Sequence, residues 1–160
     1  MRQAVDGTWR RPELHTNRTS PFFEHWPDPP SPGTHLALLR NSDAIVLAVD
    51  RDLGEVVGFV TAITDGILSA YLPLLEVRAD HRGHGIGREL VRPILESLGD
   101  LYMVDVLCDP EVLPFYESLG FTAAVGAARR QYAFQAGREE RLRSGSTDVA
   151  SAIRPAYGAR

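Results

Sequence analysis

Residues 74–90 decide the fold, and they read Leu74-Leu75-Glu76-Val77-Arg78-Ala79-Asp80-His81-Arg82-Gly83-His84-Gly85-Ile86-Gly87-Arg88-Glu89-Leu90. An apolar run ends at Val77, a short polar turn follows, and an amphipathic pattern begins at Ile86. The pattern predicts a strand, a glycine-rich loop and a helix. Such a loop leaves backbone N–H groups unpaired at the positive end of the helix dipole, and glycines let a phosphate approach them closely. We therefore expect a phosphate-bearing ligand at this loop.

Two well-known phosphate loops do not fit the spacing. A dinucleotide fingerprint, G-x-G-x-x-G, would need its last glycine at Arg88 or Leu90. A nucleoside-triphosphate loop ends in Gly-Lys-Ser/Thr, and the chain contains no lysine. A nucleotide-binding module is therefore disfavoured.

Two stretches of the sequence match known motifs. The hexapeptide Arg82–Gly87 follows the pattern R/Q-x-x-G-x-G/A, with Arg82, Gly85 and Gly87 at the defining positions. The later stretch 109–121 is similar to N-x-x-A-x-x-F-Y-x-x-x-G-F and matches at Phe115, Tyr116, Gly120 and Phe121. It departs at Asp109 and Val112, where asparagine and alanine are common. With these two motifs, residues 44–134 resemble the GNAT superfamily of acetyl-CoA-dependent N-acetyltransferases.

The resemblance implies the GNAT fold, of the α/β (α+β) class. This fold is a mixed, mostly antiparallel twisted sheet with a central splayed parallel strand pair and flanking helices. We expect one acetyltransferase domain over residues 1–135, with a variable N-terminal segment at 1–30. Residues 136–160 read as a C-terminal tail that is either solvated or an arm packed on a second subunit.

Local signals predict the elements of this domain. Ser31 followed by Pro32 begins a helix that ends near Asn41. Strands are expected at 44–50, 55–63, 68–77 and 101–108, with the last buried on both faces, and residues 121–125 and 130–135 read as a closing antiparallel pair. Further helices start at Ile86 and at Asp109, and a hairpin turn is expected at residues 51–54. Pro73 predicts a bulge or a place where the neighbouring strand has parted.

Composition narrows the class of protein. The 160 residues are 44% hydrophobic and 24% charged, typical of one globular domain, and the net charge of −4 argues against nucleic-acid binding. No apolar run is long enough to cross a membrane and no signal peptide is evident. A single cysteine, Cys108, makes a cytoplasmic location the default expectation. The scattered histidines give no metal-site spacing, so we expect no metal.

The resemblance also implies a role for particular residues. Coenzyme A would be bound by the loop, by the end of the preceding strand and by part of the second motif, namely Leu75, Glu76, Val77, Arg82, Gly83, His84, Gly85, Ile86, Gly87, Arg88, Asp109 and Tyr116. Tyr116 would be the general acid, because a phenol has a pKa near that of a departing thiol and can donate to sulfur. The alternative for Tyr116 is a half-buried helix aromatic that only packs.

Glu76 is the candidate base, directly or through water, although a salt bridge with Arg78 is an equally good interpretation. Tyr71 stands where some members carry a catalytic glutamate, and here it would shape the acceptor pocket. The acceptor pocket would also be bordered by the loop 126–129 and by the aromatic side chains of the N-terminal segment, Phe22, Phe23 and Trp26.

The sequence thus predicts an N-acetyltransferase that moves an acetyl group from acetyl-CoA to a primary amine of a small molecule or peptide. Direct attack is the simpler mechanism, because no Ser/His/Asp or Cys/His set is present for covalent catalysis. The alternative is a non-catalytic acyl-CoA-binding or sensing module. The tail leads us to expect a homodimer whose interface includes the C-terminal region.

Overall fold

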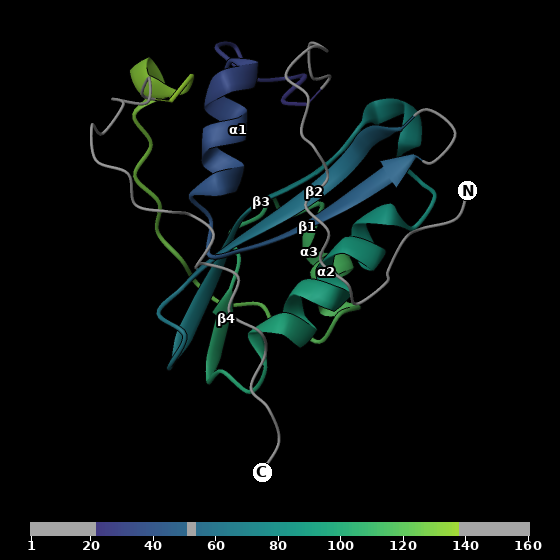
Figure 1. The fold of residues 1–160 in the computed structure, drawn as a ribbon. Helices are drawn as coiled ribbons and strands as arrows, with labels where there is room; N and C mark the ends of the chain where they lie inside the picture. Colours follow the sequence, from purple (N-terminus) through teal and green to yellow (C-terminus); the bar gives the residue numbers. More distant parts are fainter. Residues whose placement is uncertain (1–21, 51–53, 138–160) are drawn as a thin grey trace, which may run out of the picture.

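A four-stranded sheet forms the centre of the computed structural model, which describes residues 22–50 and 54–137 (Figure 1). The strands are β1 (Ala44–Asp50), β2 (Glu55–Thr64), β3 (Ser69–Val77) and β4 (Met103–Asp105), in the spatial order β1-β2-β3-β4. The first three are antiparallel and β4 runs parallel to β3. The predicted fold class is confirmed.

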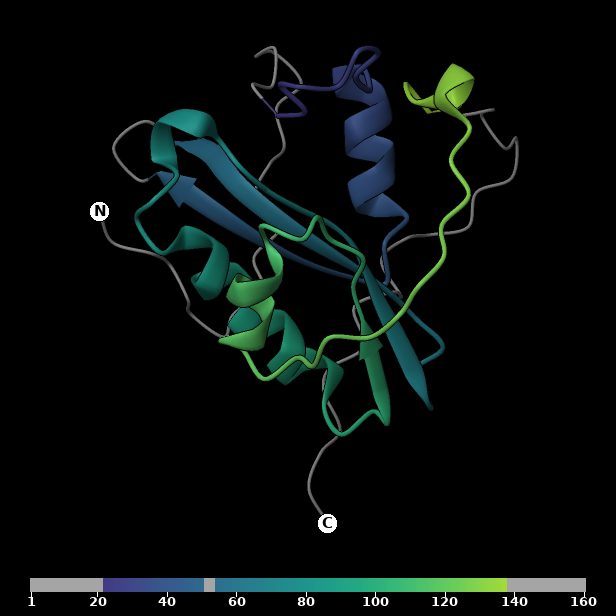
Figure 2. The same ribbon diagram turned by 180° about the vertical axis from the view of Figure 1, so that it is seen from behind.

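Helices cover both faces of this sheet. Helix α1 (Pro32–Arg40) and the segment before it lie on one face, and α2 (Ile86–Leu98) and α3 (Leu113–Glu117) lie on the other (Figures 1 and 2). Helix α1 begins as predicted, because the Ser31 hydroxyl accepts a hydrogen bond from the Thr34 N–H at 3.1 Å. Helix α2 is continuous through Pro93 and ends at Gly99.

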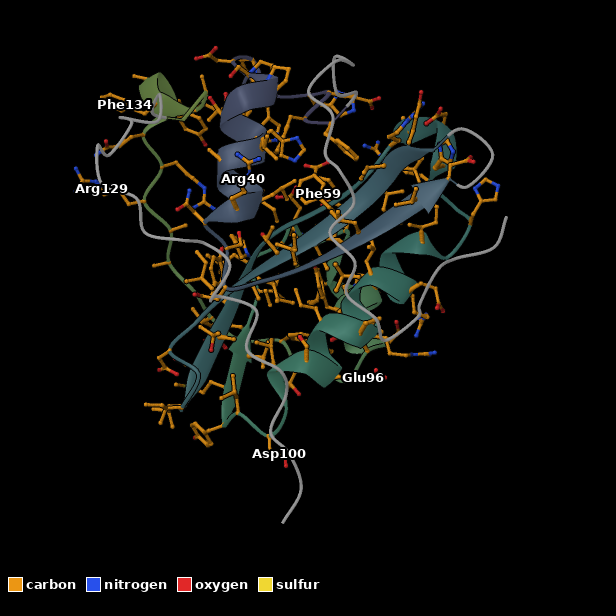
Figure 3. All side chains as sticks on the ribbon, in the orientation of Figure 1. Arg40, Phe59, Glu96, Asp100, Arg129 and Phe134 are labelled. Carbon is orange, nitrogen blue, oxygen red and sulfur yellow. The ribbon has the colours of Figure 1, made fainter. Side chains whose placement is uncertain are left out.

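Each face has its own hydrophobic core. On the α2 face, apolar residues of the sheet pack against the helix positions Ile86, Leu90, Val91 and Ile94. On the α1 face, Phe59 of β2 is fully buried between the sheet and the helix (Figure 3), where it packs with Phe22, Phe23 and Leu39. The helical periodicity that starts at Ile86 is therefore explained by burial of one stripe against the sheet.

A bulge interrupts β3 at Leu72–Pro73, as Pro73 predicts. Thr61 pairs with Leu74 whereas Ile63 pairs with Tyr71, so β3 contains one more residue than β2 between these pairs. The extra residue shifts the alternation of side chains. In consequence Tyr71 and Glu76 lie on the same face, the α1 face, although a regular strand would turn them to opposite faces.

The parallel pair is splayed. Only Ser69–Tyr71 of β3 pair with Met103–Asp105 of β4. Within residues 22–50 and 54–137, β3 from Leu72 to Val77 has no strand partner on its β4 side. The splay opens the edge of β3 just before the glycine-rich loop.

The strand predicted at 101–108 is present but shorter, and its predicted burial on both faces is wrong. Strand β4 is short and exposed at Met103 and Asp105, and Cys108, which we expected to be buried, is exposed. The closing pair at 121–125 and 130–135 is also wrong, because this segment runs without strands from α3 back toward α1 and holds only the 3-10 helix Tyr132–Phe134 (Figure 2). In its middle, residues 123–128, four alanines and a glycine offer little side-chain area for cross-strand packing. Strand β4 is therefore an edge of the described sheet, and the parallel pair is not central.

Helix α3 starts later than predicted. Asp109 and Val112 are linked in a turn, with the Val112 N–H donating to the Asp109 carbonyl at 2.9 Å, and the helix begins at Leu113. Pro114 lacks the N–H that an α-helix beginning at Pro110 would need to bond the Pro110 carbonyl. The expected turn residues 51–53, the N-terminal residues 1–21 and residues 138–160 of the tail lie outside the described chain.

Candidate functional site

The glycine-rich loop has the backbone geometry that a phosphate site needs. Gly83 and Gly85 have φ values of 77° and 81°, and a Cβ at either position would meet nothing within 4 Å. Gly85 is the N-cap residue of α2 and supplies no side-chain hydrogen bond to the first turn. The N–H groups at the start of α2 therefore face open space at the positive end of the helix dipole.

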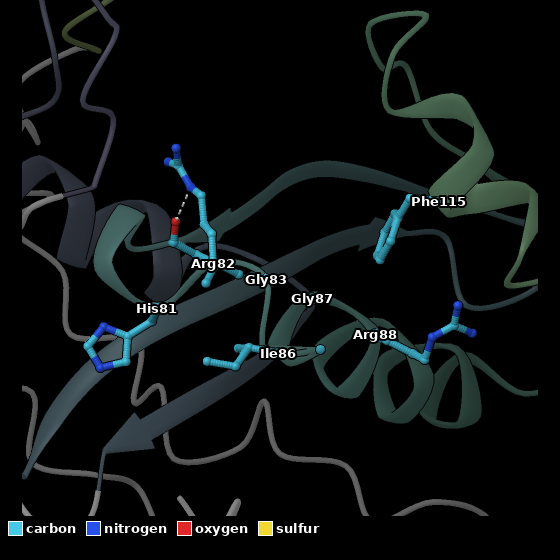
Figure 4. A pocket seen from close by; sticks show the side chains of 9 residues that line it. His81, Arg82, Gly83, Ile86, Gly87, Arg88 and Phe115 are labelled. Carbon is cyan, nitrogen blue, oxygen red and sulfur yellow. Dashed lines mark hydrogen bonds between the residues drawn. The ribbon is translucent and has the colours of Figure 1, made fainter.

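A pocket of about 290 Å³ lies at this helix start (Figure 4), and it is lined by Val77, His81, Arg82, Gly83, Gly85, Ile86, Gly87, Arg88 and Phe115. Gly87 lies against α3, where a Cβ would make ordinary van der Waals contact with the Phe115 ring at 3.4 Å. This volume is small for a whole ligand of coenzyme size and suits a phosphate group at one end of it.

Most of the expected loop residues line the pocket, and two lining residues were not expected. Phe115 belongs to the second motif, which could have identified it, and His81 is bonded to Asp80 at 2.7 Å. The expected cofactor residues that do not line this pocket are Leu75, Glu76, His84, Asp109 and Tyr116.

Two arginines flank the pocket, and each is anchored by protein groups. The Arg82 Nε donates to the Val77 carbonyl at 2.9 Å (Figure 4), and its Nη2 lies 3.7 Å from the Glu24 carboxylate. The Arg88 Nη2 donates to the Ser118 hydroxyl at 2.7 Å. Both guanidinium groups contribute positive charge beside the helix start, where an anion would be stabilised.

Tyr116 is buried, in edge-to-face contact with Phe121 and with Phe115, which lines the pocket. Burial raises the pKa of its phenol to about 12, with smaller contributions from Cys108 and Tyr71. A phenol with this pKa remains protonated at neutral pH and is available as a donor.

Glu76 lies half-buried on the α1 face, paired in register with Phe59. Burial raises the pKa of its carboxyl group, Glu24 adds to this effect, and Arg82 and His25 oppose it. The interpretation of Glu76 as a salt-bridge partner of Arg78 is wrong, because the Arg78 guanidinium pairs with Glu55 and Asp80, both at 2.8 Å. A raised pKa makes this carboxylate a better proton acceptor than an ordinary glutamate.

The N-terminal segment brings charged side chains to the site, whereas the aromatic side chains that we expected there lie in the core. The Phe22 and Phe23 rings are buried in the core of the α1 face, and Trp26 packs against that core. The segment instead exposes Glu24 and His25 beside the loop. Nothing in the sequence marked Glu24, because only the fold brings it to Arg82.

The described residues contain neither a membrane-spanning helix nor a cluster of metal-binding side chains. No helix in the ranges 22–50 and 54–137 is long and apolar enough to span a membrane. In the same ranges, no group of three or more histidine, cysteine, aspartate or glutamate side chains could hold a metal ion.

Comparison with known proteins defines the class to which this fold and loop belong. Residues 11–121 match the model of the acetyltransferase (GNAT) family, so the chain is a member of that family. A solved structure of a candidate acetyltransferase from Deinococcus radiodurans R1 is 46% identical, with a TM-score of 0.73 over 86% of this chain and 92% of that one. An acetyltransferase from Trypanosoma brucei is 26% identical, with a TM-score of 0.52 over 63% of this chain and 78% of that one.

Curated relatives match over a shorter stretch. The uncharacterized N-acetyltransferase ycf52-like protein of Prochlorococcus marinus is 31% identical over 75 residues, which are 46% of this chain and 42% of the relative. A ycf52 N-acetyltransferase of Gracilaria tenuistipitata var. liui is 31% identical over 67 residues, 41% of this chain and 37% of the relative. The chain thus matches less than half the length of these two relatives.

Proposed function

We propose that the protein is an N-acetyltransferase that moves an acetyl group from acetyl-CoA to a primary amine of a small molecule or peptide. The observation that carries the proposal is the open pocket at the start of α2, formed by left-handed glycines and flanked by two arginines. Family membership supports acetyl transfer in general. The residues Arg82–Arg88 would hold the pyrophosphate of the donor.

The splay supports a path for the rest of the donor. From Leu72 to Val77, the β3 backbone groups that do not pair with β2 face the β4 side, where they could bind an extended ligand, apart from the Val77 carbonyl that Arg82 bonds. When bound, acetyl-CoA would supply the acetyl group as a thioester. Backbone N–H groups near Glu76 and Val77 would polarise its carbonyl oxygen.

Two side chains would move protons on opposite sides of the reacting centre. Glu76, with its raised pKa, would accept a proton from the acceptor's ammonium group, directly or through water, so that the neutral amine can attack. Tyr116, protonated at neutral pH, would donate to the departing thiolate. The nearby carboxylates of Glu24 and Glu76 favour an acceptor that arrives as a cation.

An acetyl-CoA-dependent thiol-release screen tests the proposal. It should cover monoamines, polyamines, aminoglycosides, amino acids and peptide N-termini, with the Tyr116→Phe variant as the matched control. Amine-dependent release that falls in the variant supports transfer. Tight coenzyme A binding without release toward any amine would instead favour the acyl-CoA-binding module. The cytoplasmic location and the homodimer stay predictions.

A further inference from the structure

The Arg82 side chain bridges three parts of the site. Its backbone belongs to the phosphate loop, its Nε donates to the Val77 carbonyl at the end of β3 at 2.9 Å, and its Nη2 lies 3.7 Å from Glu24 of the N-terminal segment. A guanidinium group can make these contacts together because its N–H groups point in several directions from one rigid plane. Arg82 therefore has a structural partner on the donor side and another on the acceptor side.

Glu24 is held in place by its neighbours in the chain. Phe23 is the one non-glycine residue with a positive φ, 65°, among those the structure describes, and its ring is 3% exposed. The ring is fixed by edge-to-face contacts with Trp26 at 5.0 Å and His35 at 5.2 Å. The buried ring anchors an unfavourable backbone conformation, from which the next residue, Glu24, extends to the surface toward Arg82.

The charges of Glu24 and Arg82 act electrostatically on the carboxyl group of Glu76. Glu76 lies on the α1 face, as does the N-terminal segment, and it directly precedes Val77, whose carbonyl Arg82 binds. The charged and titratable groups that act on Glu76 are Arg82 from the loop and Glu24 and His25 from the N-terminal segment. Because Glu76 is half-buried, these charges are screened less than they would be in water.

We propose that Glu24 and Arg82 are positioning residues for Glu76. Their ion pair ties the N-terminal segment to the end of β3, and it sets the pH range in which Glu76 accepts a proton. The role of Glu76 as the base rests on the proposed function. The electrostatic link between the three side chains does not depend on turnover. Glu24 and Arg82 act through Glu76 and take no proton themselves.

Glu24 and Arg82 should shift the titration midpoint of Glu76 in opposite directions, so the direction of each shift tests the proposal. Removing the negative charge in Glu24→Gln should move the titration midpoint of Glu76 to lower pH. Removing the positive charge in Arg82→Gln should move the midpoint to higher pH, and Arg82→Lys should restore it toward that of the wild type. The measurement is carboxyl ¹³C NMR of Glu76 in the full chain across the pH range.

Matched controls lie on the outer side of α2. Glu96→Gln and Arg92→Gln make the same charge changes at exposed positions, and Glu96 points away from the sheet (Figure 3). Both controls should leave the Glu76 midpoint unmoved. Midpoints that stay unchanged in Glu24→Gln and Arg82→Gln, or that move in the same direction, would overturn the proposal.

A second readout separates this inference from the function on which it rests. In an active enzyme the acid limb of the kcat/KM profile should follow the NMR midpoint in each variant. Signed midpoint shifts without matching shifts of the acid limb would overturn the part of the proposal that concerns proton acceptance. Should no amine be acetylated at all, the proposed function fails while the NMR titration still decides the link between Glu24, Arg82 and Glu76.

Discussion

Arg88 in the first turn of α2 is bonded to Ser118 at the end of α3. Its Nη2 donates to the Ser118 hydroxyl at 2.7 Å and its Nη1 to the Ser118 carbonyl at 3.3 Å. The hydroxyl in turn donates to the Phe115 carbonyl at 2.6 Å. The helix that begins at the phosphate loop is thereby fastened to the helix that carries Tyr116, so the two ends of a bound donor would be held by one connected unit.

Ser118→Ala should loosen this connection. The variant removes one charge-assisted hydrogen bond at an exposed site, and we expect the free energy of unfolding to fall by about 0.5–1 kcal/mol. Urea denaturation measures the change. Ser97→Ala is the control, because among the described residues the Ser97 hydroxyl bonds only the Ile94 carbonyl of its own helix, at 2.7 Å. A loss no larger than that of Ser97→Ala would show that the Arg88 contact adds no stability.

Gly85→Glu should block the phosphate site. It places a side chain and a negative charge at a left-handed N-cap position with φ of 81°. We expect coenzyme A affinity to fall by at least about tenfold, equivalent to about 1.4 kcal/mol, in a calorimetric titration. Gly66→Glu is the matched control, since Gly66 has a φ of 68° and equally open surroundings at the turn before β3. Unchanged affinity in a folded Gly85→Glu protein would contradict the assignment of the loop.

Tyr116→Phe should separate catalysis from binding. The ring and its packing remain and only the proton donor is lost, so coenzyme A binding should persist while kcat falls by about 100-fold. Steady-state kinetics across the pH range measure this. Tyr102→Phe makes the same change at an exposed position and serves as the control. Full activity of Tyr116→Phe at every pH would show that water or another group protonates the thiolate.

His35 should make the fold sensitive to acid. Its ring is buried between Phe22, Phe23 and Phe59, its Nε2 has no partner among the described residues, and burial lowers its pKa below 6.5. Below pH 6.5 the unfolded chain binds a proton that the folded chain does not, so stability falls as the pH drops toward the folded-state pKa.

The His35→Phe variant tests this. It keeps a ring in the cluster and removes the titration, so its melting temperature should change less than that of the wild type between pH 7.5 and pH 5. The exposed His84, changed to glutamine, is the control. Equal acid sensitivity in the wild type and His35→Phe would exclude His35 as the cause.

The exposed edge of β4 bears on assembly. Apolar side chains around this edge and along the segment after α3 face solvent, among them Tyr102, Leu107, Val125, Tyr132 and Phe134. We predict a homodimer whose interface includes the C-terminal region, because such apolar area is commonly covered by a partner. Sedimentation should compare the full chain with a version ending at Gly137. A full-length monomer at tens of micromolar would refute the dimer, and a dimer that survives truncation would remove the tail from it.

The sequence predicts those parts of the fold that local chemistry determines. The alternating glycines predict the loop, and the helical spacing of apolar residues from Ile86 predicts a helix with one buried face. Pro73 has no N–H to donate to a regular β-ladder, and it predicts the bulge. The two predictions that are wrong, the burial of residues 101–108 and the strand pair within residues 121–135, depend on distant partners. The segment 121–135 reads as strands by composition, yet whether it pairs depends on side-chain area that its alanines do not provide.

The site shows the same division. The pocket residues between Val77 and Arg88 follow from one continuous stretch, so their sequence positions identify them. Glu24 has no such signal, because its contact with Arg82 requires both the folding of the N-terminal segment over β2 and the strained turn at Phe23. Phe22 and Phe23, which we expected at the acceptor pocket, are instead core residues that position Glu24.

The bulge at Leu72–Pro73 decides which side chains of β3 share a face. Five positions separate Tyr71 from Glu76, so a chain of the same length that paired regularly here would turn one of the two side chains to the opposite face. Deleting Leu72 or Pro73 would leave four positions, and a regular strand would then keep both side chains on the α1 face. We therefore expect a related chain to have either a bulge or one residue fewer at this point if it keeps Tyr71 and Glu76 on one face.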